Sequence, residues 1–333
     1  MKKYLFINYY IDAGNTTLGE NFKMFFNKEF DFYDFKLLKN KVSLMNKLQS
    51  SIYLRKKIQK YNDSKKKIIF NSIGPATLAY GSYDIESSIL ILDWIRTLKD
   101  SYKYKTFKKD LIFFIQKYIL NKFGKIFVRT HVIKTHLIKH YGINQNKISL
   151  ISGPILFDKF KNKPKKILNK KPKVLFIGND FLRKGGDVIL KNQKKLFELF
   201  EITIVTSHNI KKSHNYRILK NIPYGSFEHK DLLKKNDIFF FPSNFESYGM
   251  VISEAASSGL CIITTKDTLS AKYFISNNYS GIIAKNPHSA LKELIKISKN
   301  KKKIFQLSKN IYHETKKKYN FKHLKSNFKK ILF

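Results

Sequence analysis

The chain of 333 residues is 43% hydrophobic and 15% aromatic, which excludes a largely disordered protein and leaves room for two domains of ordinary size. Its 65 Lys and Arg residues outnumber the 24 Asp and Glu residues, so the net charge is +41. Such a charge attracts nucleic acid, anionic membranes or phosphorylated small molecules, yet a compositional bias toward Lys, Asn, Ile, Phe and Tyr would produce it without any such partner.

The apolar segments are too short to be targeting signals or membrane spans. The opening stretch MKKYLFINYYIDAG lacks the length and the cleavage pattern of a signal peptide, and SSILILDWI and LIFFIQKYIL are too short or too interrupted to cross a bilayer. A single cysteine, Cys261, excludes an internal disulfide, and its apolar setting GLCIITT predicts a buried thiol in a reducing compartment. We therefore expect a cytoplasmic protein, in solution or peripheral on the inner face of a membrane.

Short apolar runs alternate with longer amphipathic stretches along the whole chain, which is typical of βαβ units around parallel sheets. In the first half the pattern predicts strands at residues 4–8, 30–35, 68–71, 89–92, 126–129 and 148–151, with helices at 41–60 and 110–121. In the second half it predicts strands at residues 174–177, 202–206, 238–241 and 261–264, and a final helix at 322–331.

The stretch DKFKNKPKKILNKKPK, residues 158–173, is rich in lysine and proline and precedes a new strand, so it is predicted to be a domain linker. It separates an N-terminal domain, residues 1–157, from a C-terminal domain, residues 174–318. The last helix, within residues 319–333, is expected to pack back toward the first domain. The predicted fold class is α/β, with two Rossmann-like doubly wound domains facing a central cleft, where ligands bind beyond the carboxyl ends of the strands.

Two glutamates flank a glycine in ESYGMVISEAASSG, directly after the apolar strand IFFF. Glu246 precedes a predicted helix and Glu254 lies about two turns into it, while the backbone amides near Gly249, Met250 and Val251 form a helix N-terminus that favours phosphate. Each carboxylate could accept two hydroxyl hydrogen bonds from a sugar diol. The alternative is structural, with Glu246 capping the helix and Glu254 on the surface.

A second candidate site is FIGNDFLRKGGD, where a strand ends in a glycine-rich loop that carries Arg183 and Lys184. The guanidinium of Arg183 can bind phosphate oxygens in pairs, and the Lys184 ammonium adds a point charge. In so basic a chain an adjacent Arg and Lys is weak evidence by itself, but the strand and the following glycines place both cations where an anionic ligand would lie.

The second half resembles the donor domain of glycosyltransferase family 4, which has the GT-B fold. VLFIGNDFLRKGGDVIL is similar to the phosphate-binding strand and loop of that family, and DLLKKNDIFFFPSNFESYGMVISEAASSGLCIITT is similar to its two-glutamate signature. The resemblance implies a retaining transfer of sugar from a nucleotide sugar, with no metal and no other cofactor. It also implies that Glu254 holds the ribose, Glu246 the donor sugar, and Arg183 with Lys184 the diphosphate. DTLSAKYFI departs from the glycine pair and acidic residue that the family carries after its signature.

The first half matches that family less well. Gly14, Asn15 and Thr16 lie where the family has a glycine-containing loop after its first strand, so they are expected to face the cleft, unless Asn15 or Thr16 caps a helix there. Where many members have an active-site histidine, this chain has Leu92, Asp93 and Trp94. Asp93 either takes over a catalytic contact with sugar or acceptor, or caps the end of a strand.

Three histidines, His131, His136 and His140, raise the question of a metal site, because the last two lie four apart on a predicted helix. No acidic residue or further ligand accompanies them, so a solvated helix face is the favoured interpretation and no metal is expected.

The leading hypothesis is a glycosyltransferase that moves a sugar from a nucleotide diphosphate to a glycan or lipid-linked acceptor, such as a polysaccharide precursor. The basic stretch at residues 39–61 could contact an anionic membrane or be an ordinary helix with solvated lysines. Three alternatives remain: a GT-B epimerase or phosphorylase, a GT-B protein that only binds glycans, and a charge-driven nucleic-acid binder. The last has no recognised motif in the sequence, so no specific nucleic acid is expected.

Overall fold

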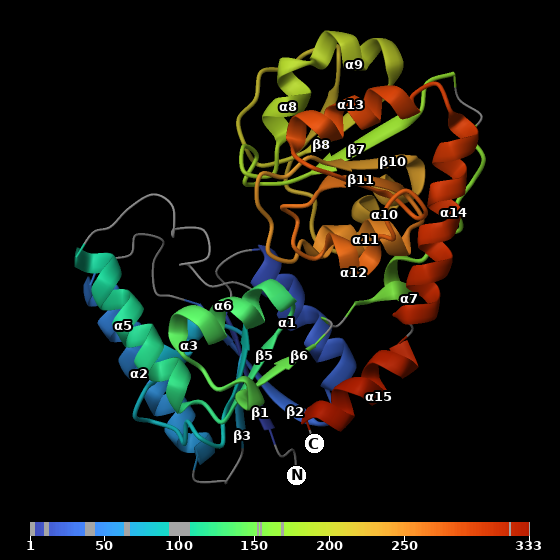
Figure 1. The fold of residues 1–333 in the computed structure, drawn as a ribbon. Coiled ribbons are helices and arrows are strands. Elements are labelled where there is room, and N and C mark those ends of the chain that lie inside the picture. The colour runs from blue at the N-terminus through green and yellow to red at the C-terminus, as the bar shows by residue number, and fades with distance from the viewer. Residues whose placement is uncertain are drawn as a thin grey trace. The chain divides into compact units, whose positions relative to one another are not determined.

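The computed structural model describes residues 4–9, 13–36, 44–62, 67–92, 107–151, 153, 155–167, 170–319 and 321–332. The chain forms two compact units, Met1–Pro154 and Ile155–Phe333. Each unit is built on one six-stranded sheet, and all pairings between the named strands are parallel (Figure 1).

The first unit has the strand order β2-β1-β3-β4-β5-β6. Its elements are β1 (Tyr4–Tyr9), α1 (Ala13–Phe26), β2 (Phe30–Phe35), α2 (Leu44–Asn62), β3 (Lys67–Phe70), α3 (Ile73–Leu78), β4 (Ile89–Leu92), α5 (Phe107–Lys122), β5 (Lys125–Val128), α6 (His131–Tyr141), the 3₁₀ turn η1 (Gln145–Lys147) and β6 (Ile148–Leu150).

Both faces of this sheet are apolar, because successive side chains of a strand point to opposite sides and each side is covered by helices. Leu5 and Ile7 of β1 belong to the core that α2, α3, α5 and α6 cover. On the opposite face Phe6 stacks on Phe22 of α1, with ring centroids 4.9 Å apart. Continuous apolar runs are therefore what these strands require.

The second unit has the strand order β12-β11-β10-β7-β8-β9. Its elements are α7 (Phe157–Phe160), β7 (Lys173–Ile177), α8 (Gly186–Lys191), α9 (Gln193–Leu199), β8 (Glu201–Val205), β9 (Arg217–Leu219), α10 (Phe227–Lys235), β10 (Ile238–Phe241), α11 (Met250–Ser257), β11 (Cys261–Thr265), α12 (Ala271–Phe274), β12 (Ile282–Ala284), α13 (Pro287–Ile297), α14 (Lys301–Lys318) and α15 (Phe321–Leu332). In Figure 1, α8, α9 and α13 lie on one side of the sheet and α10 and α11 on the other.

The ten strands predicted from the sequence are all present, with ends that differ by no more than one residue. Two further strands, β9 and β12, were not predicted. The predicted linker, residues 158–173, lies within the second unit, as does the last helix. Part of that stretch is fixed to α11, because the Asn162 N–H donates to the Ser257 carbonyl, 3.4 Å away, and the Ser258 hydroxyl donates to the Phe160 carbonyl, 2.8 Å away.

The thiol of Cys261 is buried in β11, as predicted, and burial raises its pKa to about 12. No helix in the described part of the chain combines the length and the apolarity that crossing a bilayer requires.

Candidate functional site

The two loops predicted to bind phosphate lie side by side in the second unit, because β7 and β10 are neighbours in its sheet. The loop after β7 carries Arg183 and Lys184, and the loop after β10 carries Glu246. The carbonyl of Arg183 accepts hydrogen bonds from the Asn244 N–H, at 2.9 Å, and from the Ser243 hydroxyl, at 3.3 Å. These bonds join the two loops into one unit at the carboxyl ends of the strands, where doubly wound sheets bind ligands.

Glycine is required where the loops meet. Gly185 has a φ of +79°, and a Cβ there would lie only 1.9 Å from the carbonyl oxygen of Pro242. A side chain would therefore push the cation-bearing loop away from the loop after β10, which explains the glycine that follows Arg183 and Lys184.

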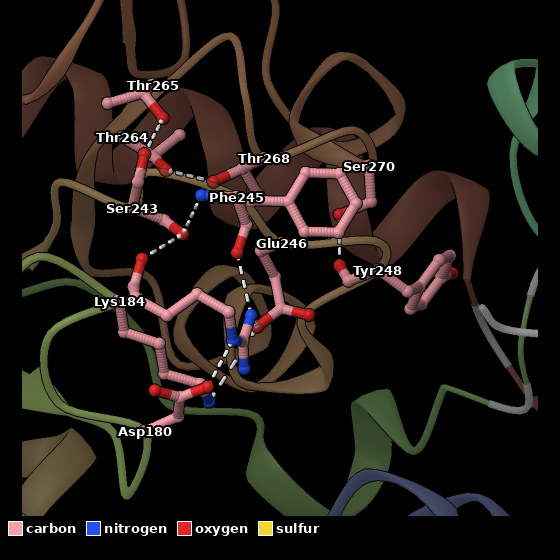
Figure 2. A network of polar contacts seen from close by, with 11 residues as sticks. Asp180, Lys184, Ser243, Phe245, Glu246, Tyr248, Thr264, Thr265, Thr268 and Ser270 are labelled. Atoms are coloured by element: carbon pink, nitrogen blue, oxygen red, sulfur yellow. Dashed lines mark hydrogen bonds and ion pairs between the residues drawn. The ribbon is translucent and has the colours of Figure 1, made fainter. Parts of the chain in front are cut away.

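A third loop, residues 266–270 after β11, holds the backbone of Glu246. The Glu246 N–H donates to the Asp267 carbonyl at 2.9 Å, and the Glu246 carbonyl accepts from the Leu269 N–H at 2.8 Å. Buried hydroxyls add to this frame: Thr268 is 2.9 Å from the hydroxyl of Thr264, and Ser270 donates to the Tyr248 carbonyl (Figure 2). The position of Glu246 is thus set by main-chain bonds to the neighbouring loop.

The side chain of Glu246 is close to both cations, and Figure 2 shows it beside Lys184. Its Oε2 is 3.2 Å from Nη1 of Arg183 and 3.8 Å from Nζ of Lys184. Arg183 also donates through Nε to Asp180 at 2.5 Å and through Nη1 to the Phe245 carbonyl at 2.7 Å. Burial acts to lower the pKa of Arg183, but the carboxylates of Glu246 and Asp180 outweigh burial and raise it, so the guanidinium stays charged.

Helix α11 begins at the predicted place, with Gly249 as its N-cap at a φ of +64°. Met250 and Val251 are its first two residues, so their backbone amides belong to the first turn, where N–H groups point out of the helix end. Glu254 is the fifth residue, one turn from the start rather than the two expected. This helix end and the cations of the β7 loop together can receive an anion.

Glu254 is buried, contrary to the alternative of a surface residue, with 5% of its area exposed. Its neighbour is His229 of α10, whose Nε2 lies 3.3 Å from Oε2 of Glu254. Both side chains are more than nine-tenths buried. Sequence reasoning missed His229.

The remaining candidates belong to the first unit. Gly14, Asn15 and Thr16 are in the first turn of α1 rather than in a loop, and because that helix begins at Ala13, neither Asn15 nor Thr16 is its N-cap. Asp93 lies outside the described residues.

His131, His136 and His140 all belong to α6, and the rings of His136 and His140 have centroids 4.4 Å apart. Burial, with a smaller contribution from His140, lowers the pKa of His136 to about 4. Among the described residues no group of three or more His, Cys, Asp or Glu side chains could hold a metal ion.

The loop at residues 266–270 was missed as well. Its sequence had been noted only for departing from the glycine pair of the resembled family. The hydroxyl residues Thr268 and Ser270 were a signal, since small hydroxyl side chains in a loop can bond to nearby backbone, as Ser270 does to the Tyr248 carbonyl.

Comparisons with known proteins support the interpretation of the second unit. Residues 158–318 match the family model described as Glycosyl transferases group 1. No curated protein shows significant similarity to the chain.

Solved structures share the fold over nearly the whole chain. HepE of Anabaena, in complex with UDP and glucose, has a TM-score of 0.76 at 12% identity, covering 100% of this chain and 99% of its own. Sucrose-phosphate synthase of Thermosynechococcus elongatus has a TM-score of 0.77 at 11% identity, covering 100% and 98%. WaaG, a glycosyltransferase involved in lipopolysaccharide biosynthesis, has a TM-score of 0.71 at 13% identity, covering 98% and 99%.

At these identities the likeness shows the fold alone, and it confirms the predicted α/β class with the GT-B architecture. The family match adds the class of activity for the second unit. The chain is therefore a glycosyltransferase with the GT-B fold, and its residues 158–318 match the model of the glycosyl transferases group 1 family.

Proposed function

We propose that this glycosyltransferase belongs to family 4 and transfers a sugar from a nucleotide-diphosphate sugar to a glycan or lipid-linked acceptor. The transfer retains the anomeric configuration and requires no metal. The observation that carries the proposal is the cluster in which Arg183 and Lys184 lie within 4 Å of Glu246, at the carboxyl ends of β7 and β10. A site for a sugar diphosphate requires this combination of cations for the phosphates and a carboxylate for sugar hydroxyls.

In the proposed reaction the bond between the anomeric carbon and the diphosphate oxygen breaks, and a bond to the acceptor oxygen forms. The leaving diphosphate takes up the acceptor proton. Arg183, Lys184 and the first turn of α11 stabilise the negative charge that grows on the diphosphate, which is the task a metal performs in other enzymes. Glu246 binds the donor sugar and Glu254 binds the ribose.

Asp93, and the residues Gly14, Asn15 and Thr16, stay predictions for the acceptor side. The cytoplasmic location stays a prediction too.

Nucleotide binding tests the donor part of the proposal. We expect one of UDP, GDP, ADP and CMP to raise the melting temperature of the unmodified protein and to have little effect on Glu254→Ala; UDP comes first because HepE binds it. A ligand at about a hundred times its dissociation constant adds roughly 2.7 kcal/mol to the free energy of unfolding. If no nucleotide stabilises the protein at millimolar concentration, the proposal fails.

Product analysis separates transfer from the other GT-B reactions. A transferase releases nucleotide from its sugar donor when acceptor is added, whereas an epimerase changes the donor without an acceptor and a phosphorylase requires phosphate. Retention is read from the anomeric configuration of the product.

A contact with anionic membrane is also part of the proposal, and a surface of the first unit supports it. On α5 the side chains of Leu111, Phe114, Ile115 and Tyr118 form one stripe at helical spacing and are 42% to 63% exposed. Lys122 continues the stripe, with its Nζ 5.7 Å from the Tyr118 ring centroid. An exposed apolar stripe of this kind is a site of interaction.

The charges around the stripe favour an anionic bilayer as its partner. Helix α2 carries five Lys or Arg residues and no acid, and α5 carries four Lys residues and one acid. Both helices contact α3, so they contribute to one side of the unit. Apolar side chains flanked by cations bind lipid surfaces through burial of the former and attraction of the latter.

Vesicle flotation tests this contact independently of catalysis. The protein is expected to float with vesicles that contain phosphatidylglycerol and not with pure phosphatidylcholine, and Phe114→Ser with Ile115→Ser should abolish flotation. Phe227→Ser removes a more exposed ring from the second unit and should change nothing. Undiminished flotation of the double variant would contradict the assignment, and dimerisation through α5 would appear as a change in sedimentation.

A further inference from the structure

His229 is the third residue of α10 and takes part in the cap of that helix. The hydroxyl oxygen of Ser226, the N-cap residue, accepts the His229 N–H at 3.1 Å. In return Nδ1 of His229 accepts the Gly225 N–H at 2.9 Å. A glutamate or glutamine at this helix position often reaches back to the cap in the same way. Because Nδ1 uses its lone pair as an acceptor, the proton of the neutral ring resides on Nε2.

The other end of the ring is directed at Glu254. Nε2 lies 3.3 Å from Oε2 of Glu254, but the two groups are not aligned for a hydrogen bond, and among the described residues Nε2 has no hydrogen-bond partner. A buried N–H without a partner costs free energy. A small rotation of the carboxylate would satisfy it, so a ligand that turns the carboxylate can gain this bond.

The ring itself is held in place by aromatic neighbours. Its centroid lies 5.4 Å from that of Phe160 and 5.9 Å from that of Tyr224. Lys159 lies over the Tyr224 ring, with its Nζ 4.4 Å from the centroid. The imidazole is therefore a fixed donor, and the carboxylate of Glu254 is the partner that adjusts.

We propose that His229 is a positioning residue, which orients the Glu254 carboxylate so that it accepts the ribose hydroxyls of a nucleoside diphosphate. The inference rests on the ribose role proposed for Glu254. With one oxygen held by the Nε2 proton, the remaining lone pairs face the ligand, and a 2′-deoxyribose leaves one of them without a partner. The pair of residues consequently selects ribonucleotides over deoxyribonucleotides.

Two variants separate the two ends of the ring. In His229→Asn the amide oxygen replaces Nδ1 and keeps the contact with the Gly225 N–H, but no group reaches Glu254. In His229→Gln the amide nitrogen replaces Nε2 and restores a donor to Glu254. Melting curves of both variants show whether they fold as the unmodified protein does.

Calorimetric titration with UDP, GDP, ADP and their 2′-deoxy forms measures the preference for ribose. We expect the unmodified protein to prefer the ribonucleotide about tenfold, as for one hydrogen bond to a charged group. The preference should fall to about one in His229→Asn and in Glu254→Ala, and should largely return in His229→Gln.

The outcomes distinguish the inference from the function it builds on. If Glu254→Ala keeps the full preference for ribose, or if no nucleotide binds, the proposed role of Glu254 fails and the inference fails with it. If Glu254→Ala loses the preference and a folded His229→Asn keeps it, only the role of His229 is overturned.

Discussion

Replacing Glu246 by glutamine separates the binding of diphosphate from the transfer of sugar. Oε2 of Glu246 is paired with Arg183 at 3.2 Å and with Lys184 at 3.8 Å, so this carboxylate would compete with a diphosphate for the same cations. Glutamine keeps the shape and removes the charge. The loop stays in place, because the bonds to Asp267 and Leu269 involve only the backbone of Glu246.

The size of the effect follows from the exposure of the three side chains, which is 12% for Glu246, 22% for Arg183 and 21% for Lys184. Exposed ion pairs contribute about 0.2–1 kcal/mol, and breaking a fully buried pair costs about 3–5 kcal/mol. For the two partly buried pairs of Glu246 we take a combined contribution of about 1.5 kcal/mol, which corresponds to roughly a tenfold change in a dissociation constant. Glu246→Gln should therefore bind UDP, or whichever nucleoside diphosphate the protein accepts, about tenfold more tightly, while turnover falls because the contact with the donor sugar is lost.

Titration calorimetry at low and high salt measures this gain, which should shrink as salt screens the cations. Asp180→Asn is the matched control: it removes the other carboxylate paired with Arg183, but this side chain is 55% exposed, so affinity should change less and turnover should be retained. Equal or weaker binding of the diphosphate by Glu246→Gln at both salt concentrations would refute the assignment of these cations to the diphosphate.

Three further outcomes are expected. Gly249→Ala should destabilise the protein by about 1–2 kcal/mol in urea denaturation, because a side chain at a φ of +64° is strained and its Cβ would lie 2.9 Å from Cγ of Glu246. Cys261 should resist iodoacetamide at about pH 8 until urea is added, because burial raises the pKa of its thiol to about 12 and keeps it protonated; rapid native labelling would contradict this. Burial lowers the pKa of His136 to about 4 in the folded protein, whereas the pKa of an unfolded histidine is about 6.5. Below about pH 6.5 the unfolded chain therefore binds a proton that the folded protein does not. The free energy of unfolding should thus fall by about 1 kcal/mol between pH 6.5 and 4, a figure discounted for solvent screening because the ring is partly exposed. In His136→Gln this pH dependence should disappear.

Strand positions could be predicted closely where a strand is buried on both faces. The runs that became β4 and β10 were predicted to the residue, because a parallel sheet covered on both sides requires an uninterrupted apolar segment. Strands β9 and β12 are three residues long and lie at the edges of the second sheet, and the apolar runs in YRILK and GIIAK end with the strands themselves. The equally short edge strand β6 was predicted because Ile151 extends its apolar run.

The candidate site could be predicted in part. Arg183, Lys184 and Glu246 were found because each follows an apolar strand, and the carboxyl ends of neighbouring strands meet. The partners that hold them were not found, because Thr268 contacts Glu246 across strands and His229 reaches Glu254 from another helix. The pattern S-x-x-H at the start of α10 resembles a capping box, but histidine in place of glutamate hides it.

Because the loop after β11 holds Glu246 through backbone bonds, side chains of this loop can be varied in engineered forms of the enzyme. Its bonds to Glu246 come from the backbone of Asp267 and Leu269, whereas the buried side chains of Thr268 and Ser270 fix the loop from beneath. The side chains of Asp267 and Leu269 are partly exposed, and the bonds to Glu246 do not involve them. If Glu246 binds the donor sugar as proposed, a small library randomised at these two positions should change sugar preference while the backbone that holds Glu246 is left intact.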